Sequence, residues 1–454
     1  MKRVLIANRG EIACRVIAAC RTLGLESVVV YSDADAKARH VRLADRAVHI
    51  GPSRVDRSYL NVEAILEAAR AESVDAIHPG YGLLSESAAF ARAVAKAGLI
   101  WVGPAAETID AMGDKGRARA IAEAAGVPVL PGTERFLELN VEELADRAAP
   151  IGFPLLVKAA GGGGGIGMRQ VDRMEDLAGV VQTTQGMAAR AFGDGTVYLE
   201  RLVSRARHIE VQVFGFGDGR AVHLFERECS IQRRFQKVIE EGPSPVVDEA
   251  TRAEMTAAAV ALAENQSYAG AGTVEFIFDD ETGKFYFLEM NTRIQVEHAV
   301  TEMITGVDLV QMQLRLAAGA QPTLTQDDIG RSGHAIECRI YAENPAKKFM
   351  PSPGRLDRVV YPAASDHVRV DTGFEQGDEI TPFYDPLIAK IIVRGEDRAD
   401  ALARCRAVFV DIAVDGVATN IALLRTVFDH PAFIDGATFT DFLDRHRDDL
   451  LAPA

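Results

Sequence analysis

The sequence contains no apolar run that approaches the roughly 18 residues a membrane-spanning helix needs. Positive charge is also in short supply, because 50 lysines and arginines stand against 65 acids and leave a formal net charge of −15. Nucleic acids and anionic membranes reward an excess of Lys and Arg, so this balance argues against both as main partners. Any anionic substrate must therefore be bound by local cations.

Cysteine is scarce as well, and the five cysteines follow no metal-ligand spacing. An odd number of scattered cysteines fits a reducing compartment, where disulfides do not persist. Together with the lack of a targeting or membrane segment, this predicts a cytoplasmic protein. Cys14 and Cys20 lie in a predicted helix and are expected to be small buried side chains. The other three are Cys229, Cys338 and Cys405.

The composition is otherwise that of a globular protein, and the length allows two or three domains. Residues 3–110 alternate short apolar strands with helical segments, which predicts a parallel sheet covered on both faces. The first strand leads into Ala7–Glu11, a turn without the full GxGxxG spacing, so a dinucleotide site is weakly supported. A later turn, His78–Gly82, either lines a site at a strand end or is a plain structural turn.

Two lysines and a glycine-rich loop that follows them are candidate phosphate-binding groups. A helical region around residues 112–125 contains Lys115, and a later strand ends near Lys158. Six residues of Gly161–Gly167 are glycine, and their backbone N–H groups would let a phosphate come close. The loop joins strand to strand and lacks a Gly-Lys-Ser/Thr ending, so it is neither a P-loop nor a Rossmann turn. A flexible linker is the plain alternative, but the nearby lysine and flanking strands favour a mobile lid over phosphates.

The stretch Phe285–His298 carries the densest set of reactive side chains. Four apolar residues come first, after which polar and apolar residues alternate as in a β-strand. At about 3.3 Å per residue the polar face would extend over roughly 26 Å, so that one end serves a metal and the other a second reactant. A half-exposed surface strand with salt bridges is the alternative, although Asn and Gln are poor choices for a solvating face. The polar positions are Glu289, Asn291, Arg293, Gln295 and Glu297.

A preceding strand, Thr273–Phe278, carries one acid where a core side chain is expected. A three-residue hairpin loop, Glu281–Gly283, would place Gly283 in the left-handed conformation. In that register the facing pairs are Asp280 with Lys284, Ile277 with Phe287, and Glu275 with Glu289.

The facing acids predict a metal site. Two carboxylates about 5 Å apart repel each other unless a cation lies between them. Their oxygens suit Mg²⁺ or Mn²⁺, with substrate phosphates completing the coordination shell. A one-residue slip of the strands would place the acids on opposite faces and remove the site.

Two other charged stretches, considered alone, are expected to be solvated. Residues 226–237 mix charges too densely for a core and would most often form a solvated face. Glu337 and Arg339 share one face of the alternating strand His334–Ile340. By default these two residues form an exposed ion pair or remain two solvated charges.

These segments in combination and order resemble the biotin carboxylase component of biotin-dependent carboxylases, within the ATP-grasp superfamily. The similarity extends over nearly the whole chain. It is carried by Ala7–Ala13, His78–Gly82, the glycine loop, Glu228–Arg234, Glu289–His298, and Asp415–Gly416 before Thr419–Asn420.

The resemblance implies an α/β and α+β fold in three parts. The first is a Rossmann-like N-terminal biotin carboxylase domain over residues 1–112. The second is an ATP-grasp domain over residues 113–330, with a glycine-rich lid subdomain at about 131–203. The third is a mixed α+β C-terminal domain over residues 331–447.

The resemblance also implies ATP-dependent carboxylation of biotin by bicarbonate through carboxyphosphate, the first half-reaction of an acyl-CoA carboxylase. Glu297 would be the general base, and Arg339 would stabilise the biotin enolate. The bicarbonate ligands would be Lys237, Arg293, Gln295 and the Val296 backbone. The Mg²⁺ or Mn²⁺ ligands would be Glu275, Glu289 and Asn291. The ATP ligands would be Lys115, Lys158, Gly163, Gly164, Gly165, Gly167, Glu200, Val203, His208 and Gln232.

Two positions depart from the family pattern. Ile166 stands where many members have a basic residue, so the lid lacks one expected phosphate contact. Phe235 stands where some members have His, which removes one expected polar contact to the nucleotide. Neither position is a proposed catalytic group.

No Met-Lys-Met biotinylation signature stands near the C-terminus. The resemblance therefore implies a biotin carboxyl carrier on another polypeptide or on a region outside this sequence, together with a carboxyltransferase and a homodimer. Another ATP-grasp ligase would share the lid, lysines and metal acids but has no reason to group Arg293, Gln295 and Glu297. A non-catalytic ATP-binding sensor would need no base.

Overall fold

The N-terminal part of the chain forms a five-stranded parallel sheet, which confirms the fold predicted from its alternating strands and helices. The computed structural model describes residues 1–138, 141–160, 167–234, 236–320 and 323–451. The strand order is β3-β2-β1-β4-β5. The elements are β1 (Arg3–Ile6), α1 (Gly10–Thr22), β2 (Glu26–Tyr31), α2 (Arg39–Leu43), β3 (Arg46–His49), α3 (Val62–Ala71), β4 (Ala76–His78), α4 (Ala88–Lys96) and β5 (Ile100–Trp101).

Two short helices follow where the sequence predicts one helical region. The first is α5 (Ala106–Gly113) and the second is α6 (Lys115–Ala124). Asp114 separates them because it leaves the helical conformation and its side chain accepts a hydrogen bond from the Arg117 N–H at 2.8 Å. This cap places Lys115 in the first turn of α6.

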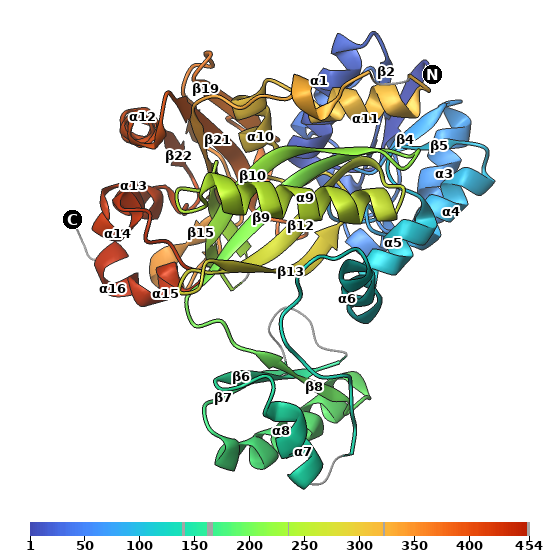
Figure 1. Cartoon of the computed structure of the whole chain (residues 1–454). Coiled ribbons are helices and arrows are strands. Elements are labelled where there is room, and N and C mark those ends of the chain that lie inside the picture. The colour runs from blue at the N-terminus through green and yellow to red at the C-terminus, as the bar shows by residue number, and fades with distance from the viewer. Residues whose placement is uncertain (139–140, 161–166, 235, 321–322, 452–454) are drawn as a thin grey trace.

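A small lobe projects from the main body and appears below it in Figure 1. It contains a three-stranded antiparallel sheet in the order β7-β6-β8, covered by two helices. The predicted glycine lid lies between β6 and β7, and its residues 161–166 fall outside the described part of the chain. The elements are α7 (Val141–Ala148), β6 (Leu155–Ala159), β7 (Met168–Val171), α8 (Met174–Phe192) and β8 (Val197–Arg201).

An eight-stranded antiparallel sheet forms the centre of the molecule (Figure 1). Its order is β13-β12-β9-β10-β11-β14-β21-β19, so three strands from the C-terminal part of the chain extend the sheet, and β14 pairs directly with β11. The strands are β9 (Ala206–Phe216), β10 (Ala221–Arg233), β11 (Gln236–Gly242), β12 (Ala269–Asp279), β13 (Lys284–Asn291), β14 (His334–Tyr341), β19 (Val368–Thr372) and β21 (Leu387–Gly395). The helices near them are α9 (Glu249–Asn265), α10 (His298–Thr305), α11 (Leu309–Ala317), α12 (Arg398–Asp411) and α13 (Ile421–Asp429).

Short elements complete the C-terminal part, where β17 pairs with β20 and β18 pairs with β22. They are β15 (Glu343–Asn344), β16 (Met350–Pro351), β17 (Gly354–Arg355), β18 (Arg358–Val360), β20 (Glu379–Ile380), β22 (Ala413–Asp415), α14 (Pro431–Ile434), α15 (Phe442–Arg445) and α16 (Arg447–Leu450). All five cysteines are buried and unbridged. None of the helices in the described ranges combines the length and apolar character that crossing a bilayer requires.

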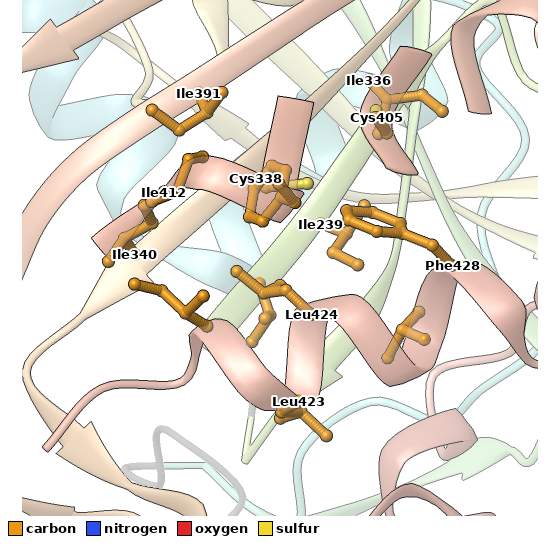
Figure 2. Close-up of a cluster of buried hydrophobic side chains, with 14 of the residues drawn as sticks. Ile239, Ile336, Cys338, Ile340, Ile391, Cys405, Ile412, Leu423, Leu424 and Phe428 are labelled. Atoms are coloured by element: carbon orange, nitrogen blue, oxygen red, sulfur yellow. The ribbon is translucent and has the colours of Figure 1, made fainter. Parts of the chain in front are cut away.

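The two faces of the large sheet differ in chemistry at β11, β14 and β21. On one face, Ile239, Cys338 and Ile391 pack against Leu424 and Phe428 of α13 (Figure 2). The opposite face of these strands carries the charged residues Glu240, Glu337, Arg339 and Lys390, together with the apolar Ile392. The apolar face fixes the sheet in place, and the charged face is directed toward the site described below.

Dense charge on β10 is buried, so the predicted solvated face over residues 226–237 is wrong. Glu226, Arg227 and Glu228 are at most 2% exposed. Each has a partner from another element: Arg252 of α9 donates to Glu226 at 2.9 Å, and Ser244 donates to Glu228 at 2.7 Å. Charges are tolerated in a core when they are paired in this way.

Near its loop, the hairpin of β12 and β13 departs from the predicted register. The loop has four residues, 280–283, because Asp279 pairs with Lys284. The predicted pairs of Asp280 with Lys284 and of Ile277 with Phe287 are therefore wrong. Gly283 does adopt the predicted left-handed conformation, with φ of 68°.

Farther from the loop, the two acids face each other as predicted. The ladder shifts by one residue between Phe276 and Glu275, which leaves Leu288 as an additional residue on β13. The shift brings Glu275 opposite Glu289. The predicted pair is correct, although a bulge and not the loop length produces it.

The extended strand predicted through Glu297 ends at Asn291. The chain then bends over Thr292–Val296 and enters α10 at His298. Consequently, Arg293, Gln295 and Glu297 do not continue a straight polar face, and the predicted span of about 26 Å is wrong. The bend brings Gln295 into contact with Glu275, and it brings Glu297 into contact with Lys237, which also contacts Glu275.

Candidate active site

One cavity of about 630 Å³ is lined by residues of both the small lobe and the large sheet. This volume lies within the range of about 300–1,000 Å³ that is common for small-molecule sites. Gly163, Gly164 and Gly165 lie outside the described residues, and Gly167 is described but does not line the cavity. The predicted residues that line it are Lys115, Lys158, Glu200, Val203, His208, Gln232, Lys237, Glu275, Glu289, Asn291, Arg293, Gln295, Val296, Glu297 and Arg339.

The acidic end of the site follows from strand register. Glu289 on β13 faces Glu275 on β12, which in turn faces Glu210 on β9. Glu210 faces Arg227 on β10. Directly opposed residues of an antiparallel sheet point to the same face, so three acids and one arginine form a row across four strands.

Lys237 of β11 connects this row to the predicted base. Its ammonium donates hydrogen bonds to Glu210 at 2.6 Å, Glu275 at 3.0 Å and Glu297 at 2.7 Å. A bulge in β11 beside Val238 determines which face Lys237 occupies. Three carboxylates around a single ammonium leave an excess of negative charge in a buried place.

Electrostatics keep these groups charged. Burial alone lowers the pKa of Lys237, but the three carboxylates outweigh it and raise that pKa well above its ordinary value. Burial alone raises the pKa of Glu275, yet Lys237 and His208 hold it well below the usual range. Glu210 is likewise held well below its usual pKa, against burial, by Lys237 and Arg227. The cluster is therefore ionic at neutral pH.

Glu289 behaves differently from its facing partner. Burial raises its pKa, and the charge of Glu275 raises it further. Among the described residues, no group donates a hydrogen bond to Glu289. Two opposed carboxylates with an adjacent amide oxygen, on Asn291, fit a hard divalent cation, which would remove the repulsion between the acids.

The remaining contacts of the acidic end hold Glu275 in place. Asn291 and Gln295 each donate to the same Glu275 oxygen, at 2.9 Å and 2.8 Å. His208 lies 3.2 Å from its other oxygen. Burial lowers the pKa of His208, but Glu275 more than compensates and raises it to about 9. His208, predicted to lie near the nucleotide, therefore also contacts an acid of the predicted metal site.

Glu297 has the properties of a general base. It is 2% exposed and lies between two cations, Lys237 and Arg339, whose Nη2 donates to it at 3.0 Å. Burial alone raises the pKa of Glu297, but Lys237 and other nearby cations lower it overall. An ionised carboxylate at the cavity wall can accept a proton from a bound acid.

The turn before Glu297 offers an anion site. Arg293 donates to Asn291 at 2.9 Å, and Gln295 accepts a hydrogen bond from Arg227 at 2.8 Å. The Val296 carbonyl accepts from Lys390 at 2.6 Å. Among the described residues, nothing accepts from the Val296 N–H. A guanidinium, an amide and a free N–H suit a small planar anion.

The opposite end of the cavity has the character of a nucleotide site. Lys158 of β6 forms an ion pair with Glu200 of β8, and these strands are neighbours in the small lobe. Lys115 lies on the facing side, in the first turn of α6. Val203 and Gln232 complete the wall. Lysines from two separate elements can neutralise a polyphosphate between them.

Arg339 and Glu337 are buried, so their predicted exposure is wrong. Arg339 is 7% exposed and Glu337 is fully buried. Arg339 lines the cavity and donates a hydrogen bond to Glu297. Sequence reasoning also missed Glu210 and Arg227 as site residues. The alternation His208-Glu210-Gln212 was the available signal for Glu210, since all three residues lie on buried β9.

A small lobe that presents a lysine to the same cavity as a large sheet with paired acids is the arrangement of an ATP-grasp ligase. The comparisons agree with this class. Residues 1–109 match "Biotin carboxylase, N-terminal domain", residues 114–325 match "Carbamoyl-phosphate synthase L chain, ATP binding domain", and residues 337–445 match "Biotin carboxylase C-terminal domain".

Relatives resemble the chain over its whole length. Biotin carboxylase 2 of Bacillus subtilis is 49% identical, over 98% of this chain and 99% of that protein. The alpha subunit of a mitochondrial methylcrotonoyl-CoA carboxylase from Arabidopsis thaliana is 47% identical over 100% of this chain, which spans 61% of the plant subunit. The chain belongs to the biotin carboxylase family.

A solved structure supports the same assignment. The biotin carboxylase domain dimer of the Hydrogenobacter thermophilus 2-oxoglutarate carboxylase, in complex with MgADP, ADP and bicarbonate, has a TM-score of 0.91 and 44% identity. The match covers 100% of this chain and 99% of that chain. The fold class predicted from the sequence is therefore confirmed.

Proposed function

We propose that this chain catalyses the ATP-dependent carboxylation of biotin by bicarbonate. The observation that carries the proposal is the position of Glu297 between Lys237 and Arg339, in the same cavity as the paired acids Glu275 and Glu289. A nucleotide-binding sensor has no use for a buried ionised base at this place. Another ATP-grasp ligase has no reason to combine it with the anion site at Arg293 and Gln295.

The first step joins bicarbonate to phosphate. Lys237, Arg293, Gln295 and the Val296 N–H would bind the anion, and Glu297 would remove its proton. The resulting carbonate oxygen attacks the γ-phosphorus of ATP, and the bond to ADP breaks. Carboxyphosphate and ADP form, and the proton remains on Glu297.

The metal site and the lobe would support this step. Glu275, Glu289 and Asn291 would hold Mg²⁺ or Mn²⁺, which neutralises charge on the phosphates when it is bound. Lys115 and Lys158 would bind phosphate oxygens. Glu200, Val203, His208 and Gln232 would line the rest of the nucleotide site, with Gly163, Gly164, Gly165 and Gly167 of the lid.

The second step transfers the carboxyl group. Carboxyphosphate breaks its bond between carbon and the phosphate oxygen and releases CO₂ and phosphate. The phosphate takes the ureido proton of biotin, and the biotin nitrogen attacks CO₂. Arg339 would stabilise the negative oxygen of the biotin enolate while this charge develops.

Partners and organisation belong to the same proposal. The biotin would be attached to a carrier protein or domain, and a carboxyltransferase would consume the carboxybiotin. A homodimer is proposed from the resemblance and from the dimer of the Hydrogenobacter domain. Residues 1–112, 113–330 and 331–447 are the proposed domains, with a lid subdomain at about 131–203. A cytoplasmic location is proposed from the unbridged cysteines and the similarity to a bacterial biotin carboxylase.

The test follows ADP release by the purified chain with ATP, Mg²⁺, bicarbonate and free biotin. We expect ADP release to require both bicarbonate and biotin, and labelled bicarbonate to appear in carboxybiotin. Chelation of the metal should stop the reaction. ATP turnover that is indifferent to biotin would instead identify another ligase, and ATP binding without turnover would identify a sensor.

A further inference from the structure

Two glutamates behind Arg339 have no role in the proposed reaction. Glu240 of β11 and Glu337 of β14 face each other directly in the strand register. Both are fully buried. None of their four carboxylate oxygens accepts a hydrogen bond from a described residue. Buried polar atoms without partners are uncommon, so this arrangement calls for a physical cause.

The charges around the pair are unequal. Arg339 Nη2 lies 2.6 Å from Glu240 Oε1, and the same nitrogen donates to Glu297 at 3.0 Å. Glu337 forms no ion pair with a described residue. Glu240 therefore has a cation beside it and Glu337 does not.

The other charged groups on this face are already engaged. Lys237 of β11 is held by three carboxylates. Lys390 of β21 donates to the Val296 carbonyl at 2.6 Å and contacts Glu11 at 3.2 Å. His298 of α10 is uncharged, because burial holds its pKa well below the ordinary value. The nearby cations Lys390 and Arg339 offset only part of the rise in the pKa of Glu337, because both are engaged by other groups.

A proton explains the missing hydrogen bonds. Ionised carboxylates only accept, so two of them that face each other cannot bond without a proton. Burial raises the pKa of Glu240 to about 7. Burial raises the pKa of Glu337 well above its ordinary value, and Glu240 adds to this while Lys390 opposes it. Like charges in one buried site favour a single shared proton.

We propose that Glu240 is a positioning residue whose carboxylate holds Arg339 against Glu297, while Glu337 is a neutral carboxylic acid that donates its proton toward Glu240. The inference deepens the proposed function and rests on it, because Arg339 is the group assigned to the biotin enolate. The apolar side of the same strands, with Ile239, Ile336 and Cys338 packed beneath α12 and α13, keeps the pair in register (Figure 2).

A comparison of two isosteric variants tests the proposal. Glu240→Gln removes the charge that faces Arg339, so we expect kcat for biotin carboxylation to fall about tenfold or more, while KM for ATP stays within about twofold. Glu337→Gln replaces a neutral acid with a neutral amide, so we expect kcat within about threefold of the wild type. If the role of Glu240 were purely structural, Glu240→Gln would change both kcat and the KM for ATP.

Thermal unfolding supplies a readout that needs no turnover. A buried acid whose pKa is raised on folding keeps a proton that the unfolded chain releases. The free energy of unfolding therefore decreases as pH rises above the unfolded pKa of that acid. Between pH 6 and 9, the wild-type Tm should therefore fall relative to that of Glu337→Gln, which has no such proton. This measurement also decides the matter if Glu240→Gln does not fold.

Three results would overturn the proposal. The first is that Glu337→Gln loses as much kcat as Glu240→Gln. The second is that Glu240→Gln keeps the wild-type kcat. The third is that the Tm values of the wild type and Glu337→Gln change in parallel with pH. Failure of the proposed function is a distinct result, because the wild type itself would then show no biotin-dependent ADP release. The Tm comparison would still test the protonated pair in that case.

Discussion

Lys237 is the residue on which the chemistry of the site converges. It reaches Glu210 and Glu275 on one side and Glu297 on the other, at 2.6–3.0 Å. Its charge opposes the effect of burial on all three acids and keeps them ionised. The same ammonium would bind an anion placed between the phosphate end and the biotin end of the cavity. Binding of that anion and ionisation of the base are therefore coupled through one side chain.

The role of Glu297 can be tested by a single change. Glu297→Gln keeps the side-chain volume but cannot accept the proton of bicarbonate, so we expect kcat to fall on the order of 10²-fold or more. ATP binding should persist, because Lys115 and Lys158 are unchanged. Steady-state ADP release and calorimetric titration with ATP measure the two quantities.

A matched control for this change is Glu254→Gln on the exposed face of α9, which should leave kcat unaltered. Near-normal turnover in Glu297→Gln would refute the assignment of the base. Loss of ATP binding together with turnover would mean that the residue supports the fold of the site.

Residue identity was largely predictable from local pattern and family resemblance, but burial was not. The polar residues from Glu289 to Glu297 were found by their alternation, and the structure places them in the cavity. Residues 226–237 were wrongly predicted to be solvated from their local charge density. Their partners, such as Arg252 and Ser244, come from distant parts of the sequence and leave no local signal. A charge that is paired across elements has no local sequence signal that separates it from a charge at the surface.

At the scale of elements, small irregularities place the reactive groups. The bulge at Leu288 brings Glu275 opposite Glu289, although the loop register was predicted incorrectly. The end of β13 at Asn291 turns the chain toward α10. The alternation rule could predict which residues share a face, but bulges and strand ends depend on pairing with neighbouring strands.

A third irregularity lies in β14 beside Arg339. Its pairing with β21 shifts between Ile340 and Tyr341, which interrupts the regular ladder. Asn420 supplies the missing bonds, because its amide donates to the Arg339 carbonyl at 2.9 Å and accepts from the Tyr341 N–H at 2.9 Å. The segment Thr419–Asn420, noted in the sequence as part of the family resemblance, thus fixes the backbone that carries Arg339.

Asn420→Ala should weaken both the fold and the site. The change leaves a buried backbone donor and acceptor without partners, which costs about 1–3 kcal/mol. Denaturant unfolding should show a lower midpoint, and kcat for biotin carboxylation should fall because Arg339 is less well placed. Asn420→Asp is the control, because it retains the acceptor for the Tyr341 N–H. Its unfolding midpoint should lie between those of the wild type and Asn420→Ala. An unfolding midpoint equal to that of the wild type would contradict this role of Asn420.

Over the whole molecule, one sheet extends from the end of the cavity assigned to the nucleotide to the end assigned to biotin. The row Glu289, Glu275, Glu210 and Arg227 lies across β13, β12, β9 and β10. Lys237 and Glu297 link it to Arg339, which faces Lys390 on β21. The three-part order of the chain was predictable from sequence. The pairing of β11 with β14, which makes the central and C-terminal strands one sheet, was not predictable, because residues 243–333 separate the two strands in the sequence.

Buried ion pairs between distant parts of the chain should control acid unfolding. Glu241 of β11 accepts from Arg398 of α12 at 2.7 Å and lies 2.7 Å from His334 of β14. Burial alone raises its pKa, but the hydrogen bond to His334 and the charge of Arg398 lower it to about 2, against an ordinary value of 4.5. A carboxyl group whose pKa is lowered on folding stabilises above its unfolded pKa and loses that contribution as pH falls.

Glu241→Gln should therefore destabilise the molecule in a pH-dependent way. A pKa lower by about 2.5 units corresponds to roughly 3 kcal/mol at neutral pH, which should shrink as pH falls from about 4.5 toward 2. Urea unfolding at pH 7 and at successive acidic pH values measures the difference between variant and wild type. Glu67→Gln, on the exposed face of α3, removes no ion pair of the described residues and serves as the control. A deficit of Glu241→Gln that stayed constant down to pH 3 would show that packing, and not charge, makes Glu241 important, since only a titrating carboxylate loses its advantage on protonation.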